Sequence, residues 1–303
     1  MLLGGLEAGG TKMVCAIGKE DGTLIDRVSV PTGTPEETIP ELIKYFKEKK
    51  VQALGIGCFG PLDLNRSSKS YGSITNTPKE GWAGINITEQ MKEALDIPVG
   101  IDTDVNAAVL GEAVYGAAKG CSSALYMTVG TGVGVGVYIN GGLVHGLVHP
   151  EAGHMMICRD QADTFQGCCP FHADCVEGLA SGKALEKRYG RKAQELSDRA
   201  DVWELESSYL AQAVANYILV YSPEKVILWG GVMHQKALLP MVREKVKKLL
   251  NGYVSHPLLT ERIDEYIVYP LLGENPGILG SIYLGMEEMK RGTCLATQDK
   301  DVF

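Results

Sequence analysis

Histidine, cysteine and glutamate side chains gather between residues 149 and 178, with glycines among them. One group is His149-Pro-Glu151-Ala-Gly-His154, and the other runs from Cys169 through His172 and Cys175 to Glu177. Thiols and imidazoles are common metal ligands, whereas carboxylates and imidazoles suit a polar, hydroxyl-rich molecule. The stretch could therefore hold both a metal ion and a polar ligand.

Two glycine turns indicate a second kind of chemistry. Gly9-Gly10-Thr11-Lys12 and Gly130-Thr131-Gly132 each stand between two predicted strands. Glycines let the backbone N–H groups approach an anion, threonine adds a hydroxyl and lysine a charge. The spacing is not that of the phosphate loop Gly-x4-Gly-Lys-Ser/Thr. A plain hairpin turn is the alternative for either turn alone, but two such turns facing each other would suit a nucleoside triphosphate.

Acidic residues follow the predicted strand at residues 99–102. Asp104 and Asn106 open a helix of small residues there. The carboxyl ends of strands are where open α/β sheets bind ligands. Asp104 could instead serve only as the cap of that helix, a common role for aspartate.

The remaining elements supply a scaffold of alternating strands and helices. Thr34-Pro-Glu-Glu37 is a capping box, and apolar residues then recur at helical spacing. The same order of elements, a strand, a Gly-Thr turn and a second strand, occurs twice, about 120 residues apart. We therefore predict an α/β protein with two homologous lobes. Further predicted helices cover residues 88–95, 178–189, 205–221, 236–250 and 277–290, and further strands cover 51–58 and 223–229.

Composition excludes several classes of protein. The 303 residues carry a formal net charge of −8, which argues against nucleic acid as a partner. The N-terminal residues do not predict a secretory signal, and the longest apolar segment, 124–139, is interrupted by glycines and does not predict a membrane span. Eight cysteines in such a chain fit a reducing compartment, and we expect a cytoplasmic protein.

These motifs together resemble the ROK family (repressors, uncharacterised frames and kinases), in particular its bacterial fructokinase branch. The resemblance covers nearly the whole chain. It rests on an ordered set of segments: 7–12, 57–62, 77–82, 102–106, 128–134, 149–178 and the Gly230-Gly231 turn.

The resemblance implies two ribonuclease-H-like lobes of the actin-like ATPase fold, with the active site in the cleft between them. The first lobe would be residues 1–115, completed by a C-terminal helix at 277–291. The second would be 116–276 with the zinc-binding loop 149–178, and 292–303 would be a loose tail.

Roles for single residues follow from the same resemblance. Asp104 would be the general base, and Asn106 would hold the sugar or the helix start. Glu151, His154 and Glu177 match the family's sugar-binding positions, with His149 beside them. Carboxylates and an imidazole can form directed hydrogen bonds with the hydroxyl groups of a sugar ring.

ATP and Mg²⁺ are the implied cofactors. The phosphates would lie on the two glycine turns, Gly9, Gly10, Thr11 and Lys12 with Gly130, Thr131 and Gly132. Gly230, Gly231 and Val232 would face the adenosine, with Lys183 nearby. Glu7 would help to place Mg²⁺ through water, because that ion keeps much of its hydration.

Zinc is the third implied cofactor. Family glucokinases usually carry three cysteines and a histidine, whereas this chain has Cys169-x2-His172-x2-Cys175, the pattern of the fructokinase branch. With His154 these residues form a closed, structural zinc set. Cys169 is the expected ligand rather than its neighbour Cys168. The alternative is a few buried cysteines beside a surface histidine.

The implied activity is ATP-dependent phosphorylation of a hexose, D-fructose to D-fructose 6-phosphate, by a homodimeric enzyme. The same fold could instead take glucose, mannose or another hexose. A sugar-sensing repressor is a further alternative, but it needs a DNA-binding segment before Glu7, where six residues stand. A scaffold without activity is the remaining alternative.

Overall fold

The computed structural model describes residues 1–77 and 79–298, with side chains up to residue 292. The chain forms two compact units. Unit 1 contains Met1–Lys119, Leu143–His149 and the chain from Leu272 onward, and unit 2 contains Gly120–Gly142 and Pro150–Leu271. The described helices include none that is both long and apolar enough to cross a membrane.

The sheet of unit 1 has five strands in the order β3-β2-β1-β4-β5. Strand β1 pairs antiparallel with β2 and parallel with β4, and β4 pairs parallel with β5. The strands are β1 (Leu3–Ala8), β2 (Lys12–Gly18), β3 (Leu24–Pro31), β4 (Leu54–Cys58) and β5 (Val99–Thr103). Buried apolar residues fill β1, β2 and β4, as expected for strands covered on both faces.

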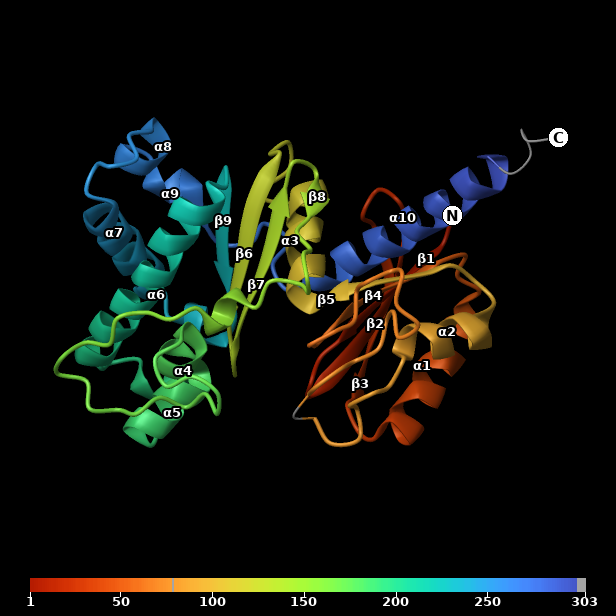
Figure 1. The fold of residues 1–303 in the computed structure, drawn as a ribbon, viewed down its shortest axis with the longest axis horizontal. Coiled ribbons are helices and arrows are strands. Elements are labelled where there is room, and N and C mark those ends of the chain that lie inside the picture. The colour runs from red at the N-terminus through yellow and green to blue at the C-terminus, as the bar shows by residue number, and fades with distance from the viewer. Residues whose placement is uncertain (78, 299–303) are drawn as a thin grey trace. The chain divides into compact units, whose positions relative to one another are not determined.

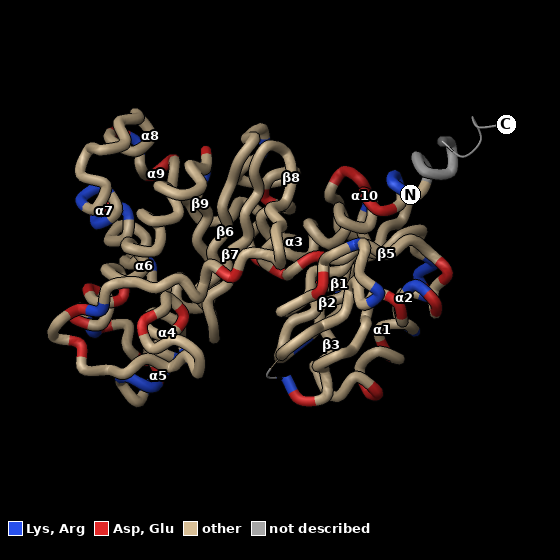
Figure 2. Tube along the Cα trace, viewed as in Figure 1, with Lys and Arg blue, Asp and Glu red and all other residues tan. Residues whose placement is uncertain are grey.

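Helices cover both faces of this sheet (Figure 1). They are α1 (Pro35–Lys49) and α2 (Ile87–Leu95) on one face, and α3 (Asp104–Tyr115) and α10 (Pro276–Gln298) on the other. Gly55 of β4 and Gly280 of α10 leave no room for a side chain, because Ser281 O and Ala107 O lie against them. Helix α10 therefore meets both β4 and α3 at backbone contact. Along α1 and α2, basic and acidic positions are interspersed (Figure 2).

The sheet of unit 2 repeats this plan. Its order is β10-β9-β6-β7-β8, so that β8, β7, β6, β9 and β10 stand where β3, β2, β1, β4 and β5 stand in the first sheet. Strand β6 pairs antiparallel with β7 and parallel with β9, as β1 does with β2 and β4. The strands are β6 (Ser123–Val129), β7 (Val133–Ile139), β8 (Gly142–Leu143), β9 (Lys225–Trp229) and β10 (Ile267–Val268). The predicted α/β repeat is confirmed.

The helices of unit 2 follow the chain order. They are α4 (Val176–Ala180), α5 (Gly182–Tyr189), α6 (Ala200–Tyr221), α7 (Leu238–Leu250), α8 (Pro257–Thr260) and α9 (Ile263–Tyr266), with 3-10 turns η1 (Ala152–His154), η2 (Ala193–Leu196) and η3 (Gly231–His234). Helices α6 and α7 pack against each other (Figure 1).

Several element boundaries differ from the prediction, among them the start of α6 at Ala200 instead of 205 and the start of β4 at Leu54 instead of 51. The single helix expected at 178–189 is wrong: the chain breaks at Ser181, which ends α4 and caps α5 by accepting a hydrogen bond from Ala184 N at 3.1 Å. Serine competes with helical hydrogen bonding in this way. Helix α10 reaches Gln298, beyond the expected end at 291. Of the expected tail, residues 299–303 lie outside the described part of the chain.

Candidate active site and metal centre

Asp104 is the first residue of α3, directly after β5. The cap of this helix is Thr103, whose Oγ1 accepts a hydrogen bond from Asn106 N at 3.1 Å. Asp104 Oδ1 accepts one from Val105 N at 2.8 Å. Burial raises the pKa of Asp104 to about 6. A carboxylate whose pKa lies near neutrality is suited to proton transfer.

Glu7 on β1 is the second perturbed carboxyl group of unit 1. Burial, and then the negative charge of Asp104, raise its pKa to about 7, against the lowering effect of Arg27 and Lys12. Gly277 packs against the Glu7 carboxylate so closely that a side chain there would meet it at 2.9 Å. Two interacting carboxylates of this kind are suited to a bound cation.

Asn106 is buried and belongs to a polar cluster at the start of α3. Its Nδ2 donates to Asp102 Oδ1 at 2.7 Å, and Thr103 N donates to the same oxygen at 2.8 Å. His145 Nε2 lies 2.8 Å from the other oxygen, Asp102 Oδ2. Nothing in the sequence indicated a role for His145 or its pairing with Asp102, because 43 residues separate the two.

The first glycine turn lies between β1 and β2. Gly9 N donates to Lys12 O at 3.1 Å, and Thr32 Oγ1 donates to Gly9 O at 2.7 Å. Gly10 has open space where a side chain would stand. Thr11 is exposed. The turn thus presents backbone and hydroxyl groups to an incoming anion.

The second glycine turn gathers other predicted residues of unit 2. Gly130 O accepts a hydrogen bond from the N-terminal residue of α5, Gly182, at 2.7 Å, beside Lys183. Gly230 has φ +105° and packs against Val129, where a side chain would collide with the backbone. A Val232 methyl group lies near Gly182. The structure therefore brings the turn, Lys183 and the Gly230–Val232 segment together.

Glu177 also reaches the second turn. Its Oε2 accepts a hydrogen bond from Val133 N at 3.1 Å, and Gly132 leaves the space that this carboxylate occupies. Glu151 is exposed and lines a cavity of about 320 Å³ together with His154, Tyr217 and Tyr221. The described contacts thus place Glu177 at the turn and Glu151 near the metal ligands.

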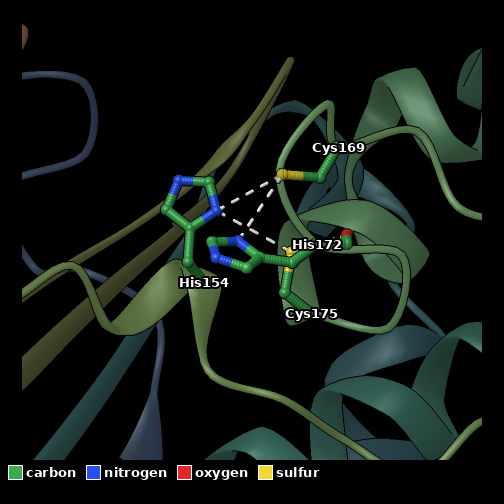
Figure 3. Close-up of side chains that lie close together, drawn as sticks. All are labelled: His154, Cys169, His172 and Cys175. Carbon is green, nitrogen blue, oxygen red and sulfur yellow. Dashed lines mark hydrogen bonds between the residues drawn. The ribbon is translucent and has the colours of Figure 1, made fainter. Parts of the chain in front are cut away.

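His154, Cys169, His172 and Cys175 converge, with their ligand atoms all within 4.8 Å of one another (Figure 3). His154 Nδ1 lies 3.6 Å from Cys169 Sγ and 3.7 Å from Cys175 Sγ, and His172 Nδ1 lies 3.9 Å from Cys169 Sγ. A tetrahedral zinc with ordinary bond lengths sets sulfur and nitrogen about 3.6 Å apart. The donor set therefore fits zinc.

Cys168 lies outside this cluster. Its Sγ is 3.5 Å from Ser181 Oγ and 3.6 Å from Glu177 O. Cys175 caps α4 by accepting from Gly178 N at 3.2 Å. A metal ion on Cys175 would thus hold the start of the short helix that carries Glu177.

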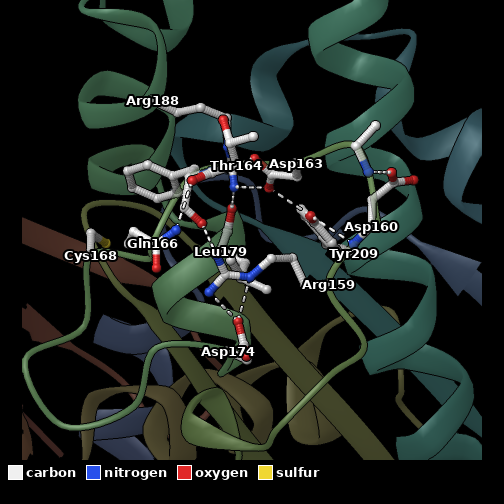
Figure 4. A network of polar contacts seen from close by, with 12 residues as sticks. Arg159, Asp160, Asp163, Thr164, Gln166, Cys168, Asp174, Leu179, Arg188 and Tyr209 are labelled. Atoms are coloured by element: carbon white, nitrogen blue, oxygen red, sulfur yellow. Dashed lines mark hydrogen bonds and ion pairs between the residues drawn. The ribbon is translucent and has the colours of Figure 1, made fainter.

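A polar network supports the loop between His154 and Cys169 (Figure 4). Arg188 Nη2 donates to Asp163 Oδ2 at 3.1 Å and to Leu179 O at 2.8 Å, and the Tyr209 hydroxyl donates to the same Asp163 oxygen at 2.7 Å. Arg159 Nε donates to Asp174 at 2.7 Å. These contacts join the loop to α4, α5 and α6, so that the loop is ordered by more than the metal ligands.

Two sheets of one strand order, each carrying a glycine turn between its first two strands, define the class: an actin-like ATPase fold with two ribonuclease-H-like halves. The chain belongs to the ROK family, whose model matches residues 3–288.

Relatives match this chain over almost all of their length. A protein of Bacillus subtilis (strain 168), provisionally named a fructokinase, is 52% identical over 95% of this chain and 97% of its own. The fructokinase of Pediococcus pentosaceus is 45% identical over 96% of this chain and 99% of its own. Among solved structures, the ROK hexokinase from Thermus thermophilus superimposes with a TM-score of 0.79 at 28% identity, over 96% of this chain and all of that one.

Proposed function

We propose that this protein is an ATP-dependent fructokinase, which converts D-fructose and ATP to D-fructose 6-phosphate and ADP. The observation that carries the proposal is the presence of Asp104, a carboxylate with a pKa of about 6, at the start of α3 in a chain 45% identical to a fructokinase over nearly its full length. The fold and the family support a sugar kinase.

Asp104 acts as the general base. A sugar hydroxyl is a weak nucleophile, so its oxygen attacks the γ-phosphorus as the Asp104 carboxylate accepts its proton. The bond between the γ-phosphorus and the β–γ bridging oxygen breaks, and ADP leaves. Thr103 already caps α3, which leaves the Asp104 carboxylate available for this role.

The two glycine turns bind the phosphates of ATP. Gly10, Thr11 and Lys12 in unit 1, and Thr131 and Gly132 in unit 2, offer backbone N–H groups, hydroxyls and a charge. Gly9 and Gly130 shape the turns, because their N–H groups donate to Lys12 O and Gly132 O. Lys183 adds a cation beside the second turn, and Gly230, Gly231 and Val232 face the adenosine. Glu7 helps to hold Mg²⁺ through water, and the ion when bound neutralises charge on the phosphates.

The sugar is bound by Asn106, Glu151, His154 and Glu177. Zinc on His154, Cys169, His172 and Cys175 is structural, because four protein ligands close its coordination shell. Zinc bound there would fix η1, which contains His154, and α4, which contains Glu177. The proposed metal orders the sugar-binding residues, while the chemistry belongs to Asp104.

An assay of ADP release across a panel of hexoses tests the proposal. We expect fructose to give the highest kcat/KM and a product phosphorylated at the 6-hydroxyl, as determined by phosphorus NMR. A higher kcat/KM for glucose or mannose would reassign the substrate within the kinase class. Absence of ADP release with every hexose would overturn the proposal.

Two finer points belong to the same proposal. We expect a homodimer, which light scattering on the purified protein would measure. We also expect the protein to work in the reducing cytoplasm, which the free thiols of the described cysteines support.

A further inference from the structure

The segment Leu143–His149, here called the strap, belongs to unit 1, whereas the chain on both sides of it belongs to unit 2. Two histidines attach the strap to unit 1. His145 Nε2 lies 2.8 Å from Asp102 Oδ2, and His149 Nε2 accepts a hydrogen bond from Leu62 N at 3.0 Å. The strap is therefore held by side chains as well as by its covalent ends.

Asp102 connects the strap to the start of α3. Its side chain is 5% exposed, and its two oxygens have three partners. Thr103 N and Asn106 Nδ2 donate to Oδ1, while His145 faces Oδ2. Because Thr103 and Asn106 bracket Asp104 in sequence, these contacts fix the turn of backbone on which the proposed base stands.

Loss of His145 would remove the imidazole that lies 2.8 Å from Asp102 Oδ2. A buried carboxylate oxygen without a donor is costly, so the side chain would turn toward another donor or toward water. Either movement would loosen the hydrogen bonds to Thr103 and Asn106. Small displacements of a catalytic group reduce turnover strongly.

We propose that His145 is a positioning residue for the phosphorylation reaction, which acts through Asp102 on the first turn of α3. The strap carries His145 and ends at His149, two residues before Glu151. The contact between His145 and Asp102 therefore orders the chain next to both Asp104 and Glu151. The inference rests on the proposed function, because that function makes Asp104 the base and Glu151 a sugar ligand.

The groups around this pair act on His145 in opposite directions. The hydrogen bond with Asp102 raises the pKa of His145, against burial and the positive charge of Arg66, which lower it. Arg66 is itself held by Glu288 of α10, at 2.7 Å, and Tyr71 also faces the pair. The contact with Asp102 therefore outweighs the two opposing effects.

Two substitutions separate positioning from a merely structural role. His145→Phe removes the donor, and we expect kcat/KM for fructose to fall about 10- to 100-fold, mainly in kcat. His145→Gln keeps an N–H donor without the charge and should restore most of the loss. The matched control is His256→Gln, at an exposed helix cap in unit 2, which should leave kcat and KM unchanged.

Amide hydrogen exchange supplies a readout that does not need turnover. In His145→Phe we expect faster exchange over residues 102–108 and 143–149, with wild-type rates in His145→Gln and His256→Gln. Wild-type kcat/KM and wild-type exchange in His145→Phe would overturn the inference while leaving the kinase proposal intact. If the wild-type protein phosphorylates no hexose, the kinase proposal fails and exchange alone decides whether His145 orders α3. Should His145→Phe not fold, the same two measurements are made on His145→Ala, and wild-type kcat/KM with wild-type exchange there would overturn the inference.

Discussion

Thr103 Oγ1 accepts a hydrogen bond from Asn106 N at 3.1 Å, and this contact closes the first turn of α3. The sequence left open whether Asp104 served as the cap of this helix or as a base. With the cap provided by Thr103, the half-buried Asp104 carboxylate remains available for chemistry, and the next two predictions test its role directly.

Replacing Asp104 by asparagine should lower kcat by about 10²- to 10⁴-fold, the range that general-base catalysis contributes. The KM for the sugar should change little, because the amide has nearly the shape of the carboxylate. Steady-state kinetics on purified protein measure both constants. Asp96→Asn, at the left-handed residue that ends α2, is the matched control. An unchanged kcat in Asp104→Asn would contradict the assignment of the base.

The reaction should lose rate in acid. The base works in its deprotonated form, and the pKa of Asp104 is about 6, so kcat/KM should level off above that pH and fall below it. A rate profile across pH, with fructose and ATP varied at each point, measures this limb. Activity that stays constant from pH 8 to pH 5 would argue against a base with this pKa.

Removal of the proposed zinc should destabilise unit 2. Cys169→Ser and Cys175→Ser each take away a thiolate ligand, so both should lose bound metal and melt at lower temperature, as should wild-type protein treated with a chelator. Elemental analysis and a thermal scan measure the two effects. Cys168→Ser is the matched control, since Cys168 contacts Ser181 and Glu177 instead of the cluster. Freshly purified protein without zinc would refute the metal site.

Glu206 on α6 should make stability fall as pH rises. Burial raises the pKa of this carboxyl group well above its ordinary value, although Arg188 opposes the shift. The unfolded chain therefore releases a proton that the folded chain keeps, and stability decreases as pH increases from about 5 toward the folded pKa. Glu206→Gln should flatten this dependence in chemical denaturation at pH 5 and pH 8. Glu204→Gln, exposed on the same helix, should not.

Arg188 should contribute far more to stability than an exposed arginine with equally good hydrogen bonds. Its ion pair with Asp163 is nearly buried, with side chains 7% and 5% exposed. Arg188→Lys removes the buried guanidinium, whose Nη2 donates to both Asp163 and Leu179, and should cost about 1–3 kcal/mol. Arg199→Lys, in an exposed pair with Asp201, should leave the melting temperature unchanged. Equal shifts in the two variants would contradict the role given to the buried network.

Features that are close in sequence could be predicted without the structure. Cys169, His172 and Cys175 follow one another at intervals of three residues, so a single local turn can bring their side chains to one ion. The two Gly-Thr turns occur between apolar strands, and their repetition predicted the two sheets that the structure confirms. Local spacing and periodicity determine such features, because short-range backbone geometry is nearly the same in every fold.

Contacts between distant segments were decided by the tertiary structure alone. His145 reaches Asp102, and His149 reaches Leu62, because the strap packs on unit 1 after the chain has already entered unit 2. Nothing in the local sequence around either histidine specifies that pairing, since it depends on which surfaces the two sheets and their helices bury. The sequence by itself determined the chemical groups and the repeated strand pattern. Long-range packing determined which of those groups meet, because hydrogen-bond partners are selected by position in the folded chain.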